Sequence, residues 1–389
     1  MKSDIPFLDL GRGMRELRTE IDGAIGRVLD SGRYILGQEV EDFERQFAQY
    51  CGADCCVGAG NGLDALTLLL RGLGLGPGDE VIVAANTFIA TWLAVTAAGA
   101  RVVPVEPDLE TWNIDPQRVE EAVTSRTRAI LATYLYGRPA DMEALQAIAD
   151  RRCLYLLSDA AQAHGIKLRG YASAFSFYPN KNLGALGDGG AVITDDKELA
   201  RRIRTLGNYG SEQKYVHGQK GVNSRLDPLQ AAVLRVKLGH LDEWNMRRQK
   251  LAGRYCAGLE LRCGPELSIR GRSLPEDRVW HIFAIYHERR DELACALRDQ
   301  GVGTLIHYPE PPHLSGAYGD LGFKRGAFPK TEQLARTELS LPFHPHLTET
   351  EADRVMAAVL QFMEAQSNSS ELRAASAGHS NSKCFFPNR

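Results

Sequence analysis

The stretch from Leu154 to Thr194 constrains the fold of this chain more than any other. Its first part, LYLLSDAAQAHG, opens with a short apolar run that ends in an acid, Asp159. Such a run is typical of a strand buried in a parallel sheet, which delivers its last residue to the carboxyl edge, where ligands bind. A second run, from Ala172 to Tyr178, ends before Pro179. Because proline cannot donate to a strand ladder, Lys181 is expected to lie in a loop.

Lys181 by itself fits an ordinary solvated loop lysine. Its surroundings in the sequence favour chemistry, because Asp159 precedes it at a strand end, Ser176 lies between them, and several glycines follow. A pyridoxal 5′-phosphate (PLP) site needs an amine to form a Schiff base and a carboxylate to keep the pyridine nitrogen protonated. It also needs donors for a phosphate. The stretch contains all three.

Length and composition exclude several classes of protein. The 389 residues, 44% of them hydrophobic, suffice for a large core and a smaller second unit. The net charge of -3 predicts neither a nucleic-acid nor a membrane partner. No apolar run approaches the roughly 18 residues of a membrane span, and no signal peptide is evident, which predicts a cytoplasmic protein. The eight cysteines lack zinc-site spacing, so we expect no metal site and mostly buried, reduced thiols.

A second glycine-containing stretch offers donors for a phosphate. Alternating strand and helix signals between residues 54 and 152 predict βαβ units and a mostly parallel sheet. Within them, GNGLDALTLLLRGL follows a short strand and opens a helix. The backbone N–H groups of Gly62, Leu63 and Asp64 in its first turn suit a phosphate. An ordinary Asn-Gly turn fits these residues equally well, and the downstream Lys181 favours the phosphate.

Three long motifs give the chain a resemblance to a known family. DAAQAHG, then FSFYPNKNLGALGDGGAVIT, then NYGSEQKYVHGQKGVNSRLDPLQAA resemble the DegT/DnrJ/EryC1/StrS family of nucleotide-sugar aminotransferases, which are PLP enzymes of fold type I. The resemblance implies an α/β fold like that of aspartate aminotransferase. We expect a large PLP-binding domain with a mostly parallel sheet (1–245), a smaller C-terminal α/β domain (246–366) and a Ser/Asn-rich disordered tail (367–389).

The chemistry of such an enzyme assigns two catalytic residues. Lys181 is expected to form the Schiff base with the cofactor and then to move the proton during amine transfer. A free lysine, with a pKa of ~10.4, is a poor base, so the site must lower that pKa by burial or by a neighbouring cation. Asp159 is expected to pair with the protonated pyridine nitrogen.

Four further cofactor contacts follow from the resemblance. Phe88 is expected to stack on the ring, Gln162 to lie near the ring hydroxyl, and Ser176 to bind the phosphate. Asn223 matches a family residue that reaches the phosphate from the neighbouring subunit, which implies a homodimer with shared active sites. Core packing remains the alternative for Phe88, and turn or capping roles remain for the others.

Tyr178, Lys220, His307 and Tyr308 are candidate substrate contacts. The last two end the run TLIHYP, which we expect to be a strand. For each residue alone, a surface or core position is as plausible as contact. Together they suit a sugar nucleotide, whose diphosphate needs cations and whose hydroxyls need hydrogen-bond partners.

The resulting prediction is a PLP-dependent enzyme that transfers an amino group from L-glutamate to the keto group of a nucleotide-linked sugar. The motifs most resemble the branch that converts a dTDP-3-keto-6-deoxyhexose into a 3-amino-3,6-dideoxyhexose. A 4-keto or 2-acetamido-3-keto sugar is the alternative. A catalytically impaired regulatory relative is a further alternative, because the link 165–173 is shorter than in the family and Ser158 replaces its usual glutamate. A dehydratase relative would be expected to lack Lys181.

Overall fold

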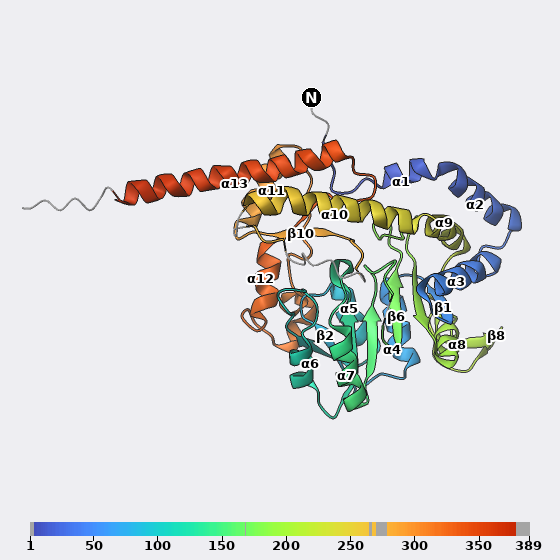
Figure 1. Cartoon of the computed structure of the whole chain (residues 1–389). Helices are drawn as coiled ribbons and strands as arrows, with labels where there is room; N and C mark the ends of the chain where they lie inside the picture. Colours follow the sequence, from blue (N-terminus) through green and yellow to red (C-terminus); the bar gives the residue numbers. More distant parts are fainter. Residues whose placement is uncertain (1–3, 168, 264–266, 270–277, 379–389) are drawn as a thin grey trace, which may run out of the picture.

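A seven-stranded sheet forms the centre of the molecule (Figure 1). The computed structural model describes residues 4–167, 169–263, 267–269 and 278–378. The strand order is β1-β7-β6-β5-β4-β2-β3, and every pair is parallel except those that β7 forms with β1 and β6. The predicted mostly parallel sheet is therefore confirmed. The strands are β1 Cys55–Ala59, β2 Glu80–Ala84, β3 Arg101–Val105, β4 Thr127–Thr133, β5 Tyr155–Asp159, β6 Ala172–Ser176 and β7 Gly190–Thr194.

Helices pack on both faces of this sheet. The alternation of side chains along a strand divides the apolar residues between two cores, so that in β2 Ile82 joins one and Val81 the other. Helices on the first face are α3 Gln38–Cys51, α6 Pro116–Ala122, α7 Met142–Arg152 and α9 Pro228–Leu238. Those on the second face are α4 Gly62–Gly72, α5 Ile89–Ala97 and α8 Lys197–Gly207.

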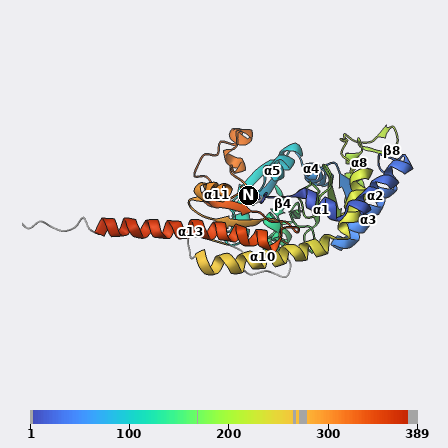
Figure 2. The same ribbon diagram turned by 90° about the horizontal axis from the view of Figure 1, so that it is seen from above.

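The C-terminal third packs around a third core of its own. Two antiparallel strands, β10 and β11, lie among helices, and Figures 1 and 2 both show α13 alongside α10. Ile5 belongs to this core and forms a parallel bridge with Val302. The elements are α10 Leu241–Cys263, β10 Phe283–Tyr286, α11 Arg290–Asp299, α12 Pro329–Thr337, β11 Glu338–Leu341 and α13 Glu349–Gly378.

Shorter elements complete the chain. Helices α1 Leu10–Glu16 and α2 Arg18–Ser31 precede α3, and β8 Ser211–Gln213 pairs with β9 Val216–His217 in a hairpin. Short 3-10 helices lie at Leu135–Gly137, Pro312–Leu314 and Gly316–Leu321. No helix in the described part of the chain is long and apolar enough to cross a bilayer.

Two expectations about the C-terminal third are wrong. The run TLIHYP is not a strand, and its pairing is limited to a bridge between Leu305 and Ser340. Residues 367–378 of the expected disordered tail instead belong to α13, which continues to Gly378, since the sequence there still supplies strong helix formers such as Ala, Glu, Leu and Arg. Residues 379–389 of the expected tail lie outside the described residues. The domain division at residue 246 falls inside α10 and stays a prediction.

The cysteines were expected to be reduced thiols, and those named next agree with this expectation. Cys51, Cys55, Cys56, Cys153 and Cys295 are free. Their expected burial holds only in part, because Cys56 is buried, Cys153 and Cys295 are exposed, and the other two are intermediate. Cys384 lies outside the described residues.

Candidate active site

The strand register brings several predicted site residues to one edge of the sheet. Asp159, the last residue of β5, lies opposite Thr133 of β4 and Ala174 of β6. Ser176, the last residue of β6, lies opposite Gly190, the first residue of β7. A pocket of about 660 Å³ opens at this edge. Ten predicted residues line it: Gly62, Leu63, Phe88, Asp159, Gln162, Ser176, Tyr178, Lys181, His307 and Tyr308.

Three predicted residues do not line the pocket. The backbone N–H of Asp64 donates to the side chain of Asn61, 2.8 Å away, and this N-cap bond uses the donor that was assigned to a phosphate. The contact of Asp64 with a phosphate stays a prediction, because Asn61 would have to release this donor when a phosphate binds. Lys220 and Asn223 are both exposed. Neither reaches the pocket of its own chain, and the bridge of Asn223 to Asn208 keeps it on the segment that follows α8.

Asp159 is almost fully buried at the floor of the pocket. The Thr91 hydroxyl donates to its Oδ2 at 2.7 Å, and the Ala161 N–H donates to its Oδ1 at 3.2 Å. Burial raises the pKa of Asp159, while these hydrogen bonds and the charge of Lys181 act in the opposite direction. The carboxylate is thus fixed in orientation and suited to pair with a buried cationic ring nitrogen.

Lys181 lies in the loop after β6, as its position beyond Pro179 predicted. Burial lowers the pKa of its amine to about 8, and the negative charge of Asp159 opposes this shift. An amine of this pKa is neutral in about a tenth of molecules at pH 7, far more than a free lysine, and the neutral form is the nucleophile and base. The structure therefore gives Lys181 the activation that the sequence reasoning required.

Two glycines allow helix α4 to approach the strand ends closely. A Cβ on Gly62 would lie 2.6 Å from the Cβ of Ser176, and a Cβ on Gly190 would lie 2.3 Å from the carbonyl oxygen of Asn61. Both positions therefore exclude any side chain without a backbone shift. This approach places the first turn of α4 beside the Ser176 hydroxyl, an arrangement suited to a phosphate.

A second wall of the pocket comes from residues near 307. The rings of Phe88 and Tyr308 lie 5.0 Å apart at their centroids. Gln162 connects the two sides, because its Nε2 lies 3.3 Å from the Tyr308 hydroxyl and its Oε1 accepts from the N–H of Tyr136. The Tyr136 hydroxyl donates to the carbonyl of His307. The wall is thus a network of side-chain contacts.

A buried acid supports this second wall from behind. Glu338 Oε2 accepts from the His307 N–H at 2.5 Å, and its Oε1 accepts from the Ser340 hydroxyl. The Ser340 hydroxyl also lies 2.8 Å from His307 Nδ1. Burial raises the pKa of Glu338 to about 7 and lowers that of His307 to about 4. His307 is therefore a neutral imidazole whose orientation depends on Glu338 and Ser340.

The shortened link after Gly165 leaves the site geometry in place. The Ser158 hydroxyl, at the position where the resemblance predicts glutamate, donates to the carbonyl of Arg169 at 3.1 Å. The Tyr171 N–H donates to the carbonyl of Leu156 at 2.8 Å. These bonds hold the link beside β5, and β6 keeps its pairing with both neighbouring strands.

Sequence reasoning missed Thr91, Ser340 and Glu338. Thr91 lies in the first turn of α5, and its hydroxyl lies 2.8 Å from that of Thr87, which precedes the helix. For Glu338 the sequence offered no signal, because it lies 31 residues from the backbone that it binds.

Known proteins resemble this chain over most of its length. The model of the DegT/DnrJ/EryC1/StrS aminotransferase family matches residues 15–360. A dTDP-3-amino-3,4,6-trideoxy-α-D-glucose transaminase from Streptomyces venezuelae is 55% identical, over 92% of this chain and 96% of the relative. A dTDP-3-amino-3,6-dideoxy-α-D-galactopyranose transaminase from Aneurinibacillus thermoaerophilus is 48% identical, over 92% and 99%. The crystal structure of S. venezuelae DesV in complex with a ketimine intermediate superimposes with a TM-score of 0.90, at 54% identity over 93% of this chain and 99% of that one.

The fit of the pocket to the expected cofactor agrees with these likenesses. The pocket combines a buried carboxylate at Asp159, an amine of lowered pKa at Lys181 and a helix N-terminus beside Ser176, which are the groups that PLP requires. With the strand edge, this pocket and the family match together, the chain belongs to the DegT/DnrJ/EryC1/StrS aminotransferase family and is a PLP-dependent transaminase.

Proposed function

We propose that this enzyme transfers the amino group of L-glutamate to the 3-keto carbon of a dTDP-linked 6-deoxyhexose. The observation that carries the proposal is the placement of Lys181 and Asp159 in one buried pocket whose volume of about 660 Å³ has room for a cofactor and a sugar ring. The names of the two relatives support the 3-position and the dTDP carrier. We place the reaction in the cytoplasm, since its charged substrates do not cross membranes unaided.

Lys181 and Asp159 have different roles in the proposed reaction. When bound, PLP supplies an aldehyde that takes up the amino group and a cationic ring that withdraws electrons. Asp159 keeps that ring protonated, and Thr91 holds the carboxylate in place. Lys181 carries the proton to and from the carbon that gains or loses the amine.

We assign the remaining cofactor contacts from the positions of the lining residues in the pocket. The first turn of α4 at Gly62 and Leu63, with the Ser176 hydroxyl, binds the phosphate. Phe88, half of whose surface is exposed at the pocket, covers the ring. Gln162 lies near the ring hydroxyl, since it lines the same pocket three residues after Asp159.

A homodimer with shared sites completes the proposal. Asn223 and Lys220 lie outside the pocket of their own chain, on the mostly exposed segment 209–223. This segment also exposes Tyr209, Tyr215, Val216 and Val222, an apolar set that suits a subunit contact. Within the dimer, Asn223 would bind the phosphate of the neighbouring site and Lys220 would attract the substrate diphosphate.

Tyr178, His307 and Tyr308 are proposed to orient the sugar. Tyr178 is 53% exposed at the rim of the pocket, where a nucleotide-linked group must enter. His307, neutral at working pH, offers a hydrogen-bonding nitrogen to the sugar hydroxyls. The relatives differ in whether the sugar keeps its 4-hydroxyl, so the state of C4 is the substrate feature to test.

The test has two stages. Visible spectra of the PLP-loaded enzyme are recorded before and after L-glutamate, and loss of the cofactor's visible band would establish the half-reaction. The enzyme whose cofactor now carries the amino group is then mixed with dTDP-3-keto-4,6-dideoxyglucose, dTDP-3-keto-6-deoxyglucose or its galactose epimer. A dTDP-4-keto sugar and a UDP-2-acetamido-3-keto sugar are the controls. Return of the band with a 3-keto dTDP sugar supports the proposal, whereas return only with a control sugar overturns it. Failure of the first stage would favour a regulatory role.

A further inference from the structure

A second cavity, of about 240 Å³, adjoins the loop that carries Lys181. It shares Asn180 and Lys181 with the cofactor pocket but otherwise has different walls. These come from residues 8–14, from Lys237 of α9, from Trp244 and Arg248 of α10, and from residues 344–346. We call this space the Arg248 cavity.

Arg248 is a buried cation without a counter-charge in the described part of the chain. Only 5% of the surface of the whole Arg248 residue is exposed. Its Nε and Nη1 atoms are buried and have no hydrogen-bond partner among the described residues. Burial lowers its pKa to about 9, and no neighbouring acid offsets this shift. A buried guanidinium left in this state is strongly unfavourable unless an anion or solvent pairs with it.

Two neighbours add donors to the same cavity. His344 is 1% exposed, and neither ring nitrogen has a hydrogen-bond partner among the described residues. Burial lowers its pKa to about 4, so the ring is neutral and keeps one N–H to donate. Lys237 donates to the carbonyl of Gly184 at 2.6 Å, which leaves further ammonium protons.

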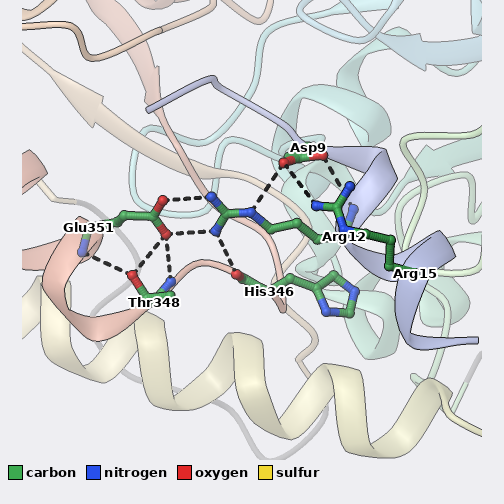
Figure 3. A network of polar contacts seen from close by, with 6 residues as sticks. All are labelled: Asp9, Arg12, Arg15, His346, Thr348 and Glu351. Atoms are coloured by element: carbon green, nitrogen blue, oxygen red, sulfur yellow. Dashed lines mark hydrogen bonds and ion pairs between the residues drawn. The ribbon is translucent and has the colours of Figure 1, made fainter. Parts of the chain in front are cut away.

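The acids around the cavity already have partners. Asp9 is the single acid among the described lining residues. Its carboxylate faces Arg12 and Arg15 (Figure 3). Arg12 Nε lies 3.1 Å and Arg15 Nη2 lies 3.9 Å from its Oδ2. Glu16, behind the wall, pairs with Arg247 and with His346. Arg248 and Lys237 therefore give the cavity an uncompensated positive charge.

We propose that the Arg248 cavity binds a small oxyanion, either a tetrahedral inorganic anion or a short carboxylate. Oxygen acceptors match the free donors of Arg248 and His344, and guanidinium groups bind oxyanions well. A volume of about 240 Å³ suits such an anion and is too small for a nucleotide sugar. Because Asn180 and Lys181 also line the cavity, the bound anion stabilises the loop that holds the catalytic lysine.

Thermal unfolding of the PLP-loaded enzyme tests this site, because the cofactor already occupies the other phosphate site. Sulfate, acetate and chloride are compared at equal ionic strength. Sulfate or acetate at about ten times its Kd should raise the Tm by about 2 °C over chloride, and the better of the two identifies the kind of oxyanion. Arg248→Met should abolish the shift, and Arg248→Lys should keep part of it. Arg118→Met, at an exposed arginine of α6, should respond like the wild type.

Crystals of the wild-type holoenzyme soaked in selenate give an independent readout that needs no variant. An anomalous peak within hydrogen-bond distance of Arg248 supports the site. Water alone beside Arg248 after both a selenate and an acetate soak, a partner-subunit carboxylate in the cavity, or an undiminished sulfate and acetate response in Arg248→Met would overturn it. None of these outcomes depends on which keto sugar the enzyme accepts.

Discussion

The two walls of the active site are held in place by different kinds of interaction. Asp159 and Ser176 end neighbouring strands, so their positions follow from the backbone ladders of the central sheet. His307 and Tyr308 lie outside any strand and are held by single contacts to Glu338, Ser340 and other side chains. The strand-edge wall should therefore tolerate changes of its side chains without moving. The 307–308 wall should shift when one supporting side chain is lost.

The largest effect is expected from Lys181→Ala. Loss of the amine should lower the amine-transfer rate at least about 10⁴-fold, because no other group at the strand edge can replace it as nucleophile and base. The sheet should fold normally, which circular dichroism would check. Lys250→Ala, on an exposed part of α10, should keep full activity. More than 1% residual turnover in Lys181→Ala would remove this lysine from the mechanism.

Asp159→Asn should cost about 10³-fold in rate, since a neutral amide cannot balance the ring cation in a buried site. Because the strand register fixes residue 159, the variant should still bind PLP, as judged from its visible absorbance. Asp30→Asn, at an exposed position near the end of α2, is the matched control. A rate within tenfold of the wild type would mean that the ring nitrogen is held by another group.

The lowered pKa of Lys181 predicts a pH dependence for cofactor uptake. The neutral amine attacks the aldehyde, so the second-order rate of PLP binding to the apoenzyme should rise about tenfold per pH unit up to about 8 and then level off. Stopped-flow absorbance measures this rate. The same reaction with Nα-acetyl-lysine should keep rising to ~10.4. A bend near 10 in the enzyme would show that burial does not activate Lys181.

On the other wall, Glu338→Gln should reduce kcat/KM about tenfold while leaving PLP binding unchanged. The carboxylate form of Glu338 accepts from the His307 N–H and from Ser340, and its pKa of about 7 means that acid weakens this support. Wild-type activity should therefore rise through pH 7, and the variant should lack this bend. Ser340→Ala should lower kcat/KM in the same direction. Identical pH profiles for wild type and Glu338→Gln would exclude the supporting role.

The smallest effect on activity, effectively none, is expected from Glu351→Gln, which tests the attachment of α13. Glu351 accepts from both Nη atoms of Arg12 and from Thr348 (Figure 3), and Arg12 lowers its pKa to about 2. Loss of these bonds should cost about 2 kcal/mol at pH 7. Since the folded pKa lies below the usual value near 4.5, the difference from wild type should shrink as the pH falls from about 4.5 towards 2.

Urea unfolding at several pH values measures this difference. Glu349→Gln is the matched control, because its side chain is 84% exposed and its loss should change the unfolding free energy little. A pH-independent difference would mean that Glu351 acts by packing rather than by charge.

The strand-edge wall could be predicted from the sequence, and the 307–308 wall only in part. Asp159 and Lys181 were found because a buried run, a proline and glycines fix their places locally. At Asp64 the sequence leaves two uses of the backbone donor open, because a helix N-cap and a phosphate site compete for it, and the structure shows this donor bonded to Asn61. TLIHYP has the composition of a strand, but its neighbours leave it a single bridge. Glu338 matters through a contact across 31 residues, and Arg248 because segments distant in sequence enclose it without a counter-charge. No local pattern reveals either.

The bridge between Ile5 and Val302 has a consequence for synthesis on the ribosome. At about 5–20 residues per second, roughly 15 to 60 s pass between the appearance of these two residues. During that interval the first segment has no strand partner, while the strands of the central sheet, residues 55–194, are being translated. The C-terminal core can therefore close only after both segments have been translated. Substitutions at Ile5 should lower the yield of native enzyme from cells more than its stability measured after refolding would suggest.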